Sequence, residues 1–98
     1  MVIAITGNGA SESISLGTGS FVLSIEAVAW DGASAVLQEA VGSTFVDSDD
    51  PYSTGNALTR TANGKVIVAS GGTKYRLNVS SFGGSTAGLR LFANSSGG

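Results

Sequence analysis

The sequence has no cysteine and no histidine, one proline, and few charged residues. Without cysteine, no disulfide can stabilise the fold and no thiol can act as a nucleophile. Because both residue types are missing, the Ser-His-Asp and Cys-His arrangements are excluded, and zinc loses its usual ligands. No Ser-x-x-Lys spacing offers a substitute. We therefore predict that the protein is not an enzyme, with no catalytic residue, no cofactor and no metal.

Only 12% of the residues are charged, where roughly 25% is usual for soluble domains. Serine, threonine and 15 glycines take the place of charge, a composition typical of strands and turns. The net charge of −2 argues against binding nucleic acid, which is held by clustered lysine and arginine. No apolar stretch approaches the roughly 18 residues of a membrane span, and no signal peptide is evident. These features predict a single soluble domain that is made in the cytoplasm and binds neither nucleic acid nor membrane.

Alternation of apolar and polar residues predicts antiparallel strands along most of the chain. The pattern is strictest at residues 74–81, where Tyr75, Leu77 and Val79 share one face. It shifts its phase after residue 25, and a β-bulge near Ala27 would turn Val28 inward. The other alternating runs lie at residues 3–5, 14–16, 21–25, 65–69 and 87–93.

Residues 33–41 fit either a short amphipathic helix or a strand, and we favour the strand because the flanking segments are strand-like. Three Asx-Gly pairs predict tight hairpin turns between strands. Together these signals predict an all-β fold: one antiparallel β-sandwich or jelly roll of seven to eight short strands over residues 1–98. Residues 94–98 are expected to form a frayed tail. The Asx-Gly pairs begin at Asn8, Asp31 and Asn63.

Every acidic residue lies at or before residue 50, and every basic residue lies at or after residue 60. Acidic and basic residues divided in this way can pair between strands of one chain, or between neighbouring copies of the protein. Arg76 and Arg90 alternate with apolar residues, so we expect both to project outward. Asp47, Asp49 and Asp50 lie in a predicted polar loop at residues 47–56, with no expected strand opposite. These three acids are therefore left for a neighbour.

Two motifs resemble binding sites but favour simpler interpretations. The Gly-Asn-Gly segment at residues 7–9 follows a strand, as in dinucleotide-binding folds, but Glu12 stands where that motif needs glycine. The acidic loop lacks the spacing of an EF-hand and its closing glutamate. A glycan site would use exposed aromatic side chains, and Tyr52 suits this better than Trp30, which we expect to anchor the core.

From residue 30 onward, five motifs follow one another along the chain. They are a Trp-Asp-Gly turn at 30–32, a strand ending in Leu37-Gln38, a Gly-Ser-Thr-Phe segment at 42–45, an Asn-Gly turn at 63–64 and a Tyr-Arg-Leu-Asn-Val strand at 75–79. This order resembles small β-sandwich virion proteins of tailed bacteriophages, closest to capsid decoration or cement proteins. The resemblance covers residues 30–84, and the longer acidic loop at residues 47–56 departs from it.

The resemblance implies a structural virion protein that forms a homo-oligomer, with a trimer favoured, and that binds the major capsid protein on the outside of the head. The alternative is a fibre or tail adhesion module that binds a host glycan. The expected partner contacts are Asp47, Asp49, Asp50, Tyr52, Arg76 and Arg90.

Overall fold

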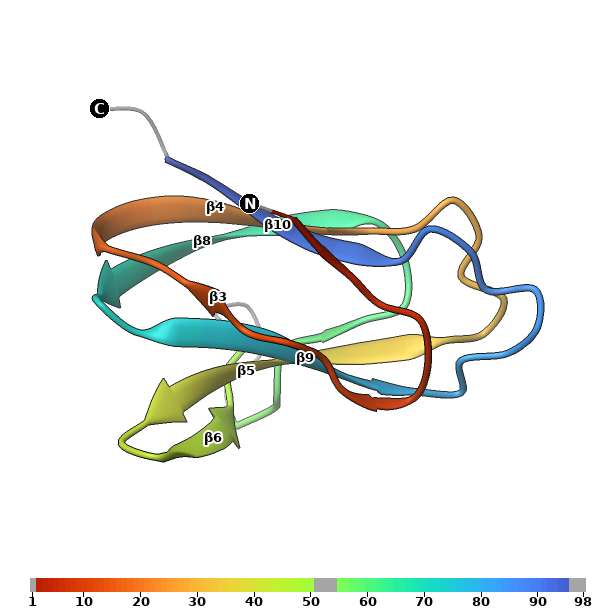
Figure 1. The fold of residues 1–98 in the computed structure, drawn as a ribbon, viewed down its shortest axis with the longest axis horizontal. Coiled ribbons are helices and arrows are strands. Elements are labelled where there is room, and N and C mark those ends of the chain that lie inside the picture. The colour runs from red at the N-terminus through yellow and green to blue at the C-terminus, as the bar shows by residue number, and fades with distance from the viewer. Residues whose placement is uncertain (1, 51–54, 96–98) are drawn as a thin grey trace.

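The computed structural model describes residues 2–50 and 55–95 and shows ten strands, with no helix in that part of the chain. The strands form two antiparallel sheets that pack face to face (Figure 1). The prediction of an all-β sandwich is therefore confirmed. In chain order the strands are β1 (Val2–Ala4), β2 (Gly9–Ala10), β3 (Ile14–Ser15), β4 (Thr18–Glu26), β5 (Ser34–Val41), β6 (Thr44–Asp47), β7 (Thr59–Arg60), β8 (Gly64–Gly71), β9 (Lys74–Ser80) and β10 (Arg90–Ser95).

The strand order is that of a jelly roll. Sheet A has the order β1-β10-β4-β8, and sheet B has the order β2-β9-β5-β6. The short strand β3 also pairs with β9, and β7 also pairs with β5. If β2 with β3, and β6 with β7, are taken as two interrupted strands, the eight strands form two interlocked Greek keys, and every connection crosses between the sheets except the one from β5 to β6. This explains why the sequence shows seven or eight strand signals although the structure has ten short elements.

The core fills the space between the sheets with side chains from alternate strand positions. Leu37 of β5 and Leu77 of β9 lie directly opposite each other in sheet B, and neither is exposed to solvent. Ile25 of β4 and Leu91 of β10 form the matching pair in sheet A, and both are buried. The alternation predicted at residues 74–81 is confirmed, because Tyr75, Leu77 and Val79 are all buried.

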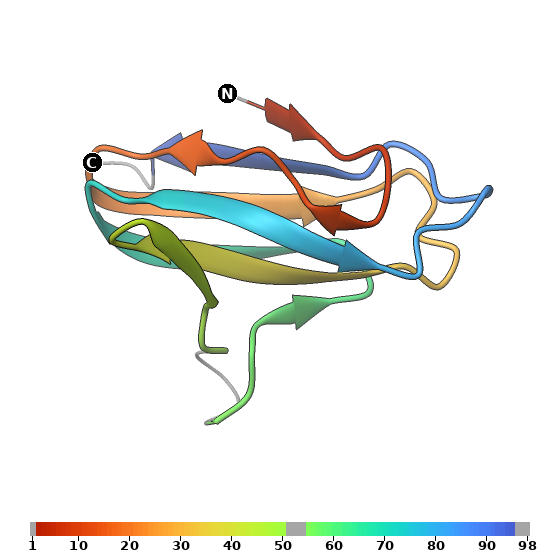
Figure 2. The same ribbon diagram turned by 60° about the horizontal axis from the view of Figure 1, so that its bottom comes forward.

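The Asx-Gly pairs form turns, but they do not form the predicted hairpins. Each joins a strand of one sheet to a strand of the other, as the turn from β4 to β5 shows (Figure 2). There Asp31 and Gly32 have φ values of 46° and 80°, and the Ala33 amide donates to the Trp30 carbonyl at 2.9 Å. Positive φ at both central residues is the geometry that an Asx-Gly pair favours. The predicted turn geometry is thus confirmed at Asp31-Gly32, whereas neither Asn63 nor Gly64 has a positive φ. The prediction of hairpins is wrong.

The phase shift after residue 25 has a different form from the one predicted. The strand β4 ends at Glu26, and the amides of Val28 and Ala29 both donate to the Ala87 carbonyl, at 2.9 and 3.1 Å. Two residues opposite one is the pattern of a β-bulge. Val28 does not turn inward, because 82% of it is exposed beside Gly88.

Residues 34–41 form the strand β5, which confirms the favoured interpretation over a helix. The neighbouring strands β9 on one side and β6 and β7 on the other pair with β5. This pairing favours a strand, and the sequence of the segment alone does not reveal it. The strand β10 continues through Asn94 and Ser95, so these two residues do not belong to a frayed tail. No helix in the described part of the chain is long and apolar enough to cross a membrane.

Candidate functional site

The outer face of sheet B holds a polar network that crosses three strands. Arg76 of β9 donates from Nε to Oε1 of Gln38 at 2.8 Å, and Gln38 of β5 donates from Nε2 to Oδ1 of Asp47 at 2.9 Å. The Arg76 guanidinium also lies 4.0 Å from the ring centroid of Phe45, a cation–π contact. Two predicted contact residues, Arg76 and Asp47, are therefore brought together within one chain, with Gln38 between them.

The expectation that Asp47 has no strand opposite it is wrong. Asp47 is the last residue of β6 and pairs in register with Gln38 of β5. Arg90 is also engaged within the chain, because its Nη2 lies 3.1 Å from Oε1 of Glu26 on the neighbouring strand. The division of charge along the sequence thus serves pairing within the fold at two places.

The predicted loop after β6 is more ordered at its base than expected. Asp49 forms an isolated bridge with Ala57, and the Asp50 amide donates to the Asn56 carbonyl at 2.9 Å. These contacts make a short stem that stands away from the body of the sandwich (Figure 2). Tyr52, the remaining expected contact residue, lies outside the described residues.

The stem does not bring metal ligands together. Within residues 2–50 and 55–95, no group of three acidic side chains is close enough to hold a metal ion.

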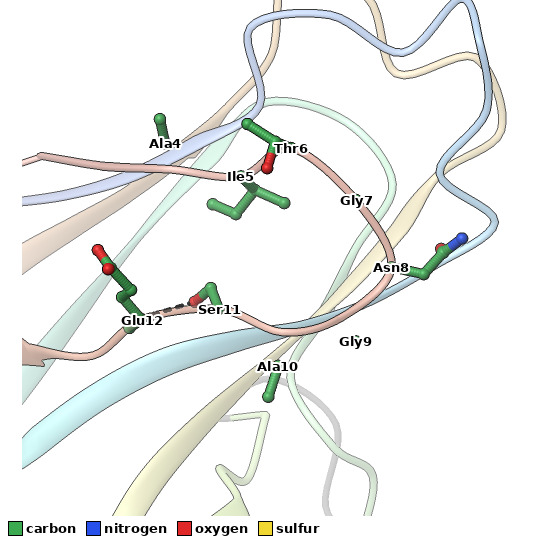
Figure 3. A pocket seen from close by; sticks show the side chains of 9 residues that line it. All are labelled: Ala4, Ile5, Thr6, Gly7, Asn8, Gly9, Ala10, Ser11 and Glu12. Atoms are coloured by element: carbon green, nitrogen blue, oxygen red, sulfur yellow. Dashed lines mark hydrogen bonds between the residues drawn. The ribbon is translucent and has the colours of Figure 1, made fainter.

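The Gly-Asn-Gly segment forms the turn between β1 and β2 and lines a hollow of about 410 Å³ (Figure 3). The Asn8 side chain accepts the Phe82 amide at 2.8 Å, and Gly9 has a φ of 97°. No helix follows, so the backbone amides needed to hold a pyrophosphate are not gathered here. The Glu12 side chain extends away from the turn, as Figure 3 shows. The segment is therefore a turn, as predicted, and a strand rather than a helix follows it.

Trp30 anchors one end of the core instead of offering a platform for sugars. Its ring is half-buried against the core, and Nε1 donates to Oδ1 of Asn63 at 2.8 Å. The same Asn63 oxygen accepts the Ala27 amide, also at 2.8 Å. A single amide side chain thus holds together the ends of β4 and β8.

We expect the change Asn63→Ala to lower the free energy of unfolding by about 1–3 kcal/mol, because two donors lose their acceptor. Asn63→Asp keeps an acceptor at the same place and should cost less. Urea denaturation followed by Trp30 fluorescence measures both. Equal losses for the two variants would contradict the role given to the Asn63 oxygen.

Burial first, and then the nearby Glu39 carboxylate, raise the pKa of Tyr75 above its ordinary value of 10.0. The folded protein holds the Tyr75 proton more tightly than the unfolded chain does. The contribution of Tyr75 to the free energy of unfolding is therefore fully present below about pH 10. That contribution is lost as the pH rises through the raised pKa. We expect Tyr75→Phe to lose less stability than the wild type between about pH 9 and pH 11 in urea denaturation. Parallel losses would show that Tyr75 is not responsible.

The outer face of sheet A carries an apolar patch that the sequence patterns did not reveal. Register places Val2 beside Phe92, and Val22 beside Ile67, all pointing away from the core. Val2 is 59% exposed and Ile67 is 70% exposed, whereas Val22 and Phe92 are half-buried. Ala4 and Ala69 extend the same face. We refer to these six residues as the sheet A patch.

The one sequence signal for this patch is continuous rather than alternating apolarity. Residues 21–23 and 66–68 are apolar at three successive positions, so Val22 of β4 and Ile67 of β8 add apolar side chains to the outer face as well as to the inner one.

No protein-family model, curated protein or solved structure matches the chain significantly. The resemblance to virion proteins therefore stays a prediction from sequence motifs.

Proposed function

We propose that this protein is a non-enzymatic structural protein of the virion. It would act as a capsid decoration or cement protomer that assembles with copies of itself and stabilises the phage head. The sheet A patch is the observation that carries this proposal, because Val2, Val22, Ile67 and Phe92 place apolar side chains on the outer face of sheet A as well as on its inner face. Burying such a face against a neighbouring protein removes apolar surface from water at about 25 cal/mol per Å².

The charges around the patch favour a protein neighbour. Arg90 and Glu26 border the patch and neutralise each other, and Lys65 is the one further charge on the neighbouring strands β4 and β8 of this face. Depletion of charge around an aromatic centre, here Phe92, is typical of the core of protein interfaces. This arrangement supports assembly through apolar contact more than through long-range attraction of opposite charges.

The jelly-roll order is compatible with the proposal but does not decide it, because viral capsid proteins and lectins share this architecture. The alternative is an adhesion module that binds a host glycan. Of the two aromatic residues considered for sugar binding, Trp30 is already engaged within the fold. The Trp30 indole nitrogen already donates to Asn63, and the ring packs on the core. Tyr52, the other candidate, lies outside the described residues.

Co-sedimentation with purified heads of the phage that encodes the chain tests the proposal. We expect the wild-type protein to pellet with heads at a fixed, saturable ratio and to raise the temperature at which the heads release DNA. A glycan array with wild type and Tyr52→Ala provides the second arm. Failure to bind heads, together with sugar binding that Tyr52→Ala abolishes, would contradict the cement proposal and support the adhesion module.

A further inference from the structure

A cleft opens on the side of the sandwich where the edge strand β8 of sheet A faces β5 and the stem that follows β6. Its volume is about 230 Å³. Pockets for drug-sized molecules are usually about 300–1,000 Å³, so this cleft suits one side chain or a small ion. Leu37, Leu58 and Val66 form apolar parts of its wall. The cleft is lined by different residues from those of the sheet A patch, except that Ile67 and Ala69 lie at the edge between them.

Three polar side chains in the cleft, Glu39, Ser48 and Asp49, have no hydrogen-bond or ion-pair partner among the described residues. Glu39 is half-buried and Asp49 is exposed, and neither carboxylate bonds or pairs with any other described residue. Ser48 is 6% exposed, and its backbone amide and carbonyl are both bonded, to Leu37 and Leu58 at 2.8 Å each. Its Oγ is nevertheless buried without any partner. Buried hydroxyls in native proteins almost always have a partner, so this oxygen indicates a missing donor.

No cation among the described residues lines the cleft to balance its two acids. Arg60 and Lys65 line an adjacent hollow instead. Arg60 is committed there, because its Nε and Nη2 donate to the carbonyls of Ala62 and Asn63 at 3.2 and 2.9 Å. The negative charge of Glu39 and Asp49 is therefore available to a cation from outside the fold.

We propose that this cleft binds a primary ammonium group on an alkyl chain, which is the chemistry of a lysine side chain from another protein. An ammonium has three donors and no acceptor, and the cleft offers acceptors on Glu39, Asp49 and Ser48. An aliphatic stem would lie along the apolar wall formed by Leu58 and Val66, as lysine stems commonly do. The site rests on its own residues, so it does not depend on the virion function proposed above.

Titration of the ¹⁵N-labelled protein with Nα-acetyl-lysine N-methylamide tests the site by amide chemical shifts. The norleucine analogue, which is isosteric but neutral, is the matched ligand control. We expect saturable shifts at Glu39, Ser48 and Asp49 with the lysine amide and not with the norleucine amide. The change Glu39→Gln should weaken binding about tenfold, because a charged hydrogen-bond acceptor is lost.

The change Glu12→Gln removes an exposed acid at the opposite edge of sheet B and should leave the affinity unchanged. Ser48→Ala, which removes only the unpartnered hydroxyl, should weaken binding several-fold without changing the rest of the spectrum. Equal shifts with the norleucine amide, no saturation with the lysine amide, or unchanged affinity in Glu39→Gln would overturn the proposal. Tighter binding of putrescine than of the lysine amide would also overturn it, because the cleft would then belong to free diamines.

Discussion

Replacing Leu37 by alanine should lower the free energy of unfolding by about 2–5 kcal/mol. Leu37 is fully buried at the centre of sheet B and lies directly opposite Leu77, which is also fully buried. Truncation there loses apolar burial and leaves a cavity that two paired strands cannot easily close. Since small domains are stable by only about 5–15 kcal/mol, the loss would be a large part of the total. Urea denaturation followed by circular dichroism measures it.

The matched control is Val41→Ala at the end of the same strand, where the side chain is 59% exposed. We expect the free energy of unfolding of this variant to lie within about 0.5 kcal/mol of the wild-type value. Similar losses in the two variants would show that the core does not lie between the sheets where the structure places it.

The second large effect concerns the sheet A patch. We expect Ile67→Asp to weaken self-association about a hundredfold or more, because a charge placed in a buried apolar interface costs at least as much as losing a hot-spot residue. Ile67 is 70% exposed in the single chain, so folding itself should be little affected. Analytical ultracentrifugation across a range of protein concentrations measures the association constant.

The control for this change is Val28→Asp, which places the same charge at a position that is 82% exposed and lies outside the patch. Its association should match that of the wild type. If Val28→Asp weakens association as much as Ile67→Asp does, added negative charge rather than the patch explains the loss. A matching urea midpoint for the two variants would show that both remain folded.

Alternation within one strand was enough to predict local structure. Tyr75, Leu77 and Val79 repeat every second residue, so the inward face of β9 could be predicted from the sequence. The Asx-Gly turns were found for the same local reason. Their role as links between sheets was not predictable, because turn chemistry sets the backbone at Asp31 and Gly32 but not which sheet the next strand joins.

The candidate sites depend on register, which the sequence patterns do not give. Gln38 joins Arg76 to Asp47 only because β5 lies between β9 and β6, and no spacing along the chain reveals that order. Ser48 and Glu39 likewise meet beside Tyr75 through pairing of distant strands. Alternation correctly predicted that Arg76 and Arg90 face outward, whereas Asp47 lies in a strand and not in the predicted loop. The partners of all three within the chain became visible only in the fold.

We expect apolar contact, rather than attraction between charges, to drive the proposed assembly. Glu26 is held by Arg90, and Asp47 is linked to Arg76 through Gln38, so these charges already interact within the chain. Apolar association is little weakened by salt, whereas attraction between exposed charges is screened within about 3 Å at 1 M ionic strength. The dependence of assembly on salt therefore separates the two mechanisms.

The most direct test of the central claim is the solution mass of the wild-type protein by sedimentation equilibrium, in dilute buffer and in about 1 M sodium chloride, where charges are screened. We predict that the wild-type protein is a homo-oligomer with the same mass at both salt concentrations. The Ile67→Asp variant should have the mass of the single chain. A wild-type protein that stays a single 9.7 kDa chain at every concentration, or an oligomer that dissociates in salt, would contradict it.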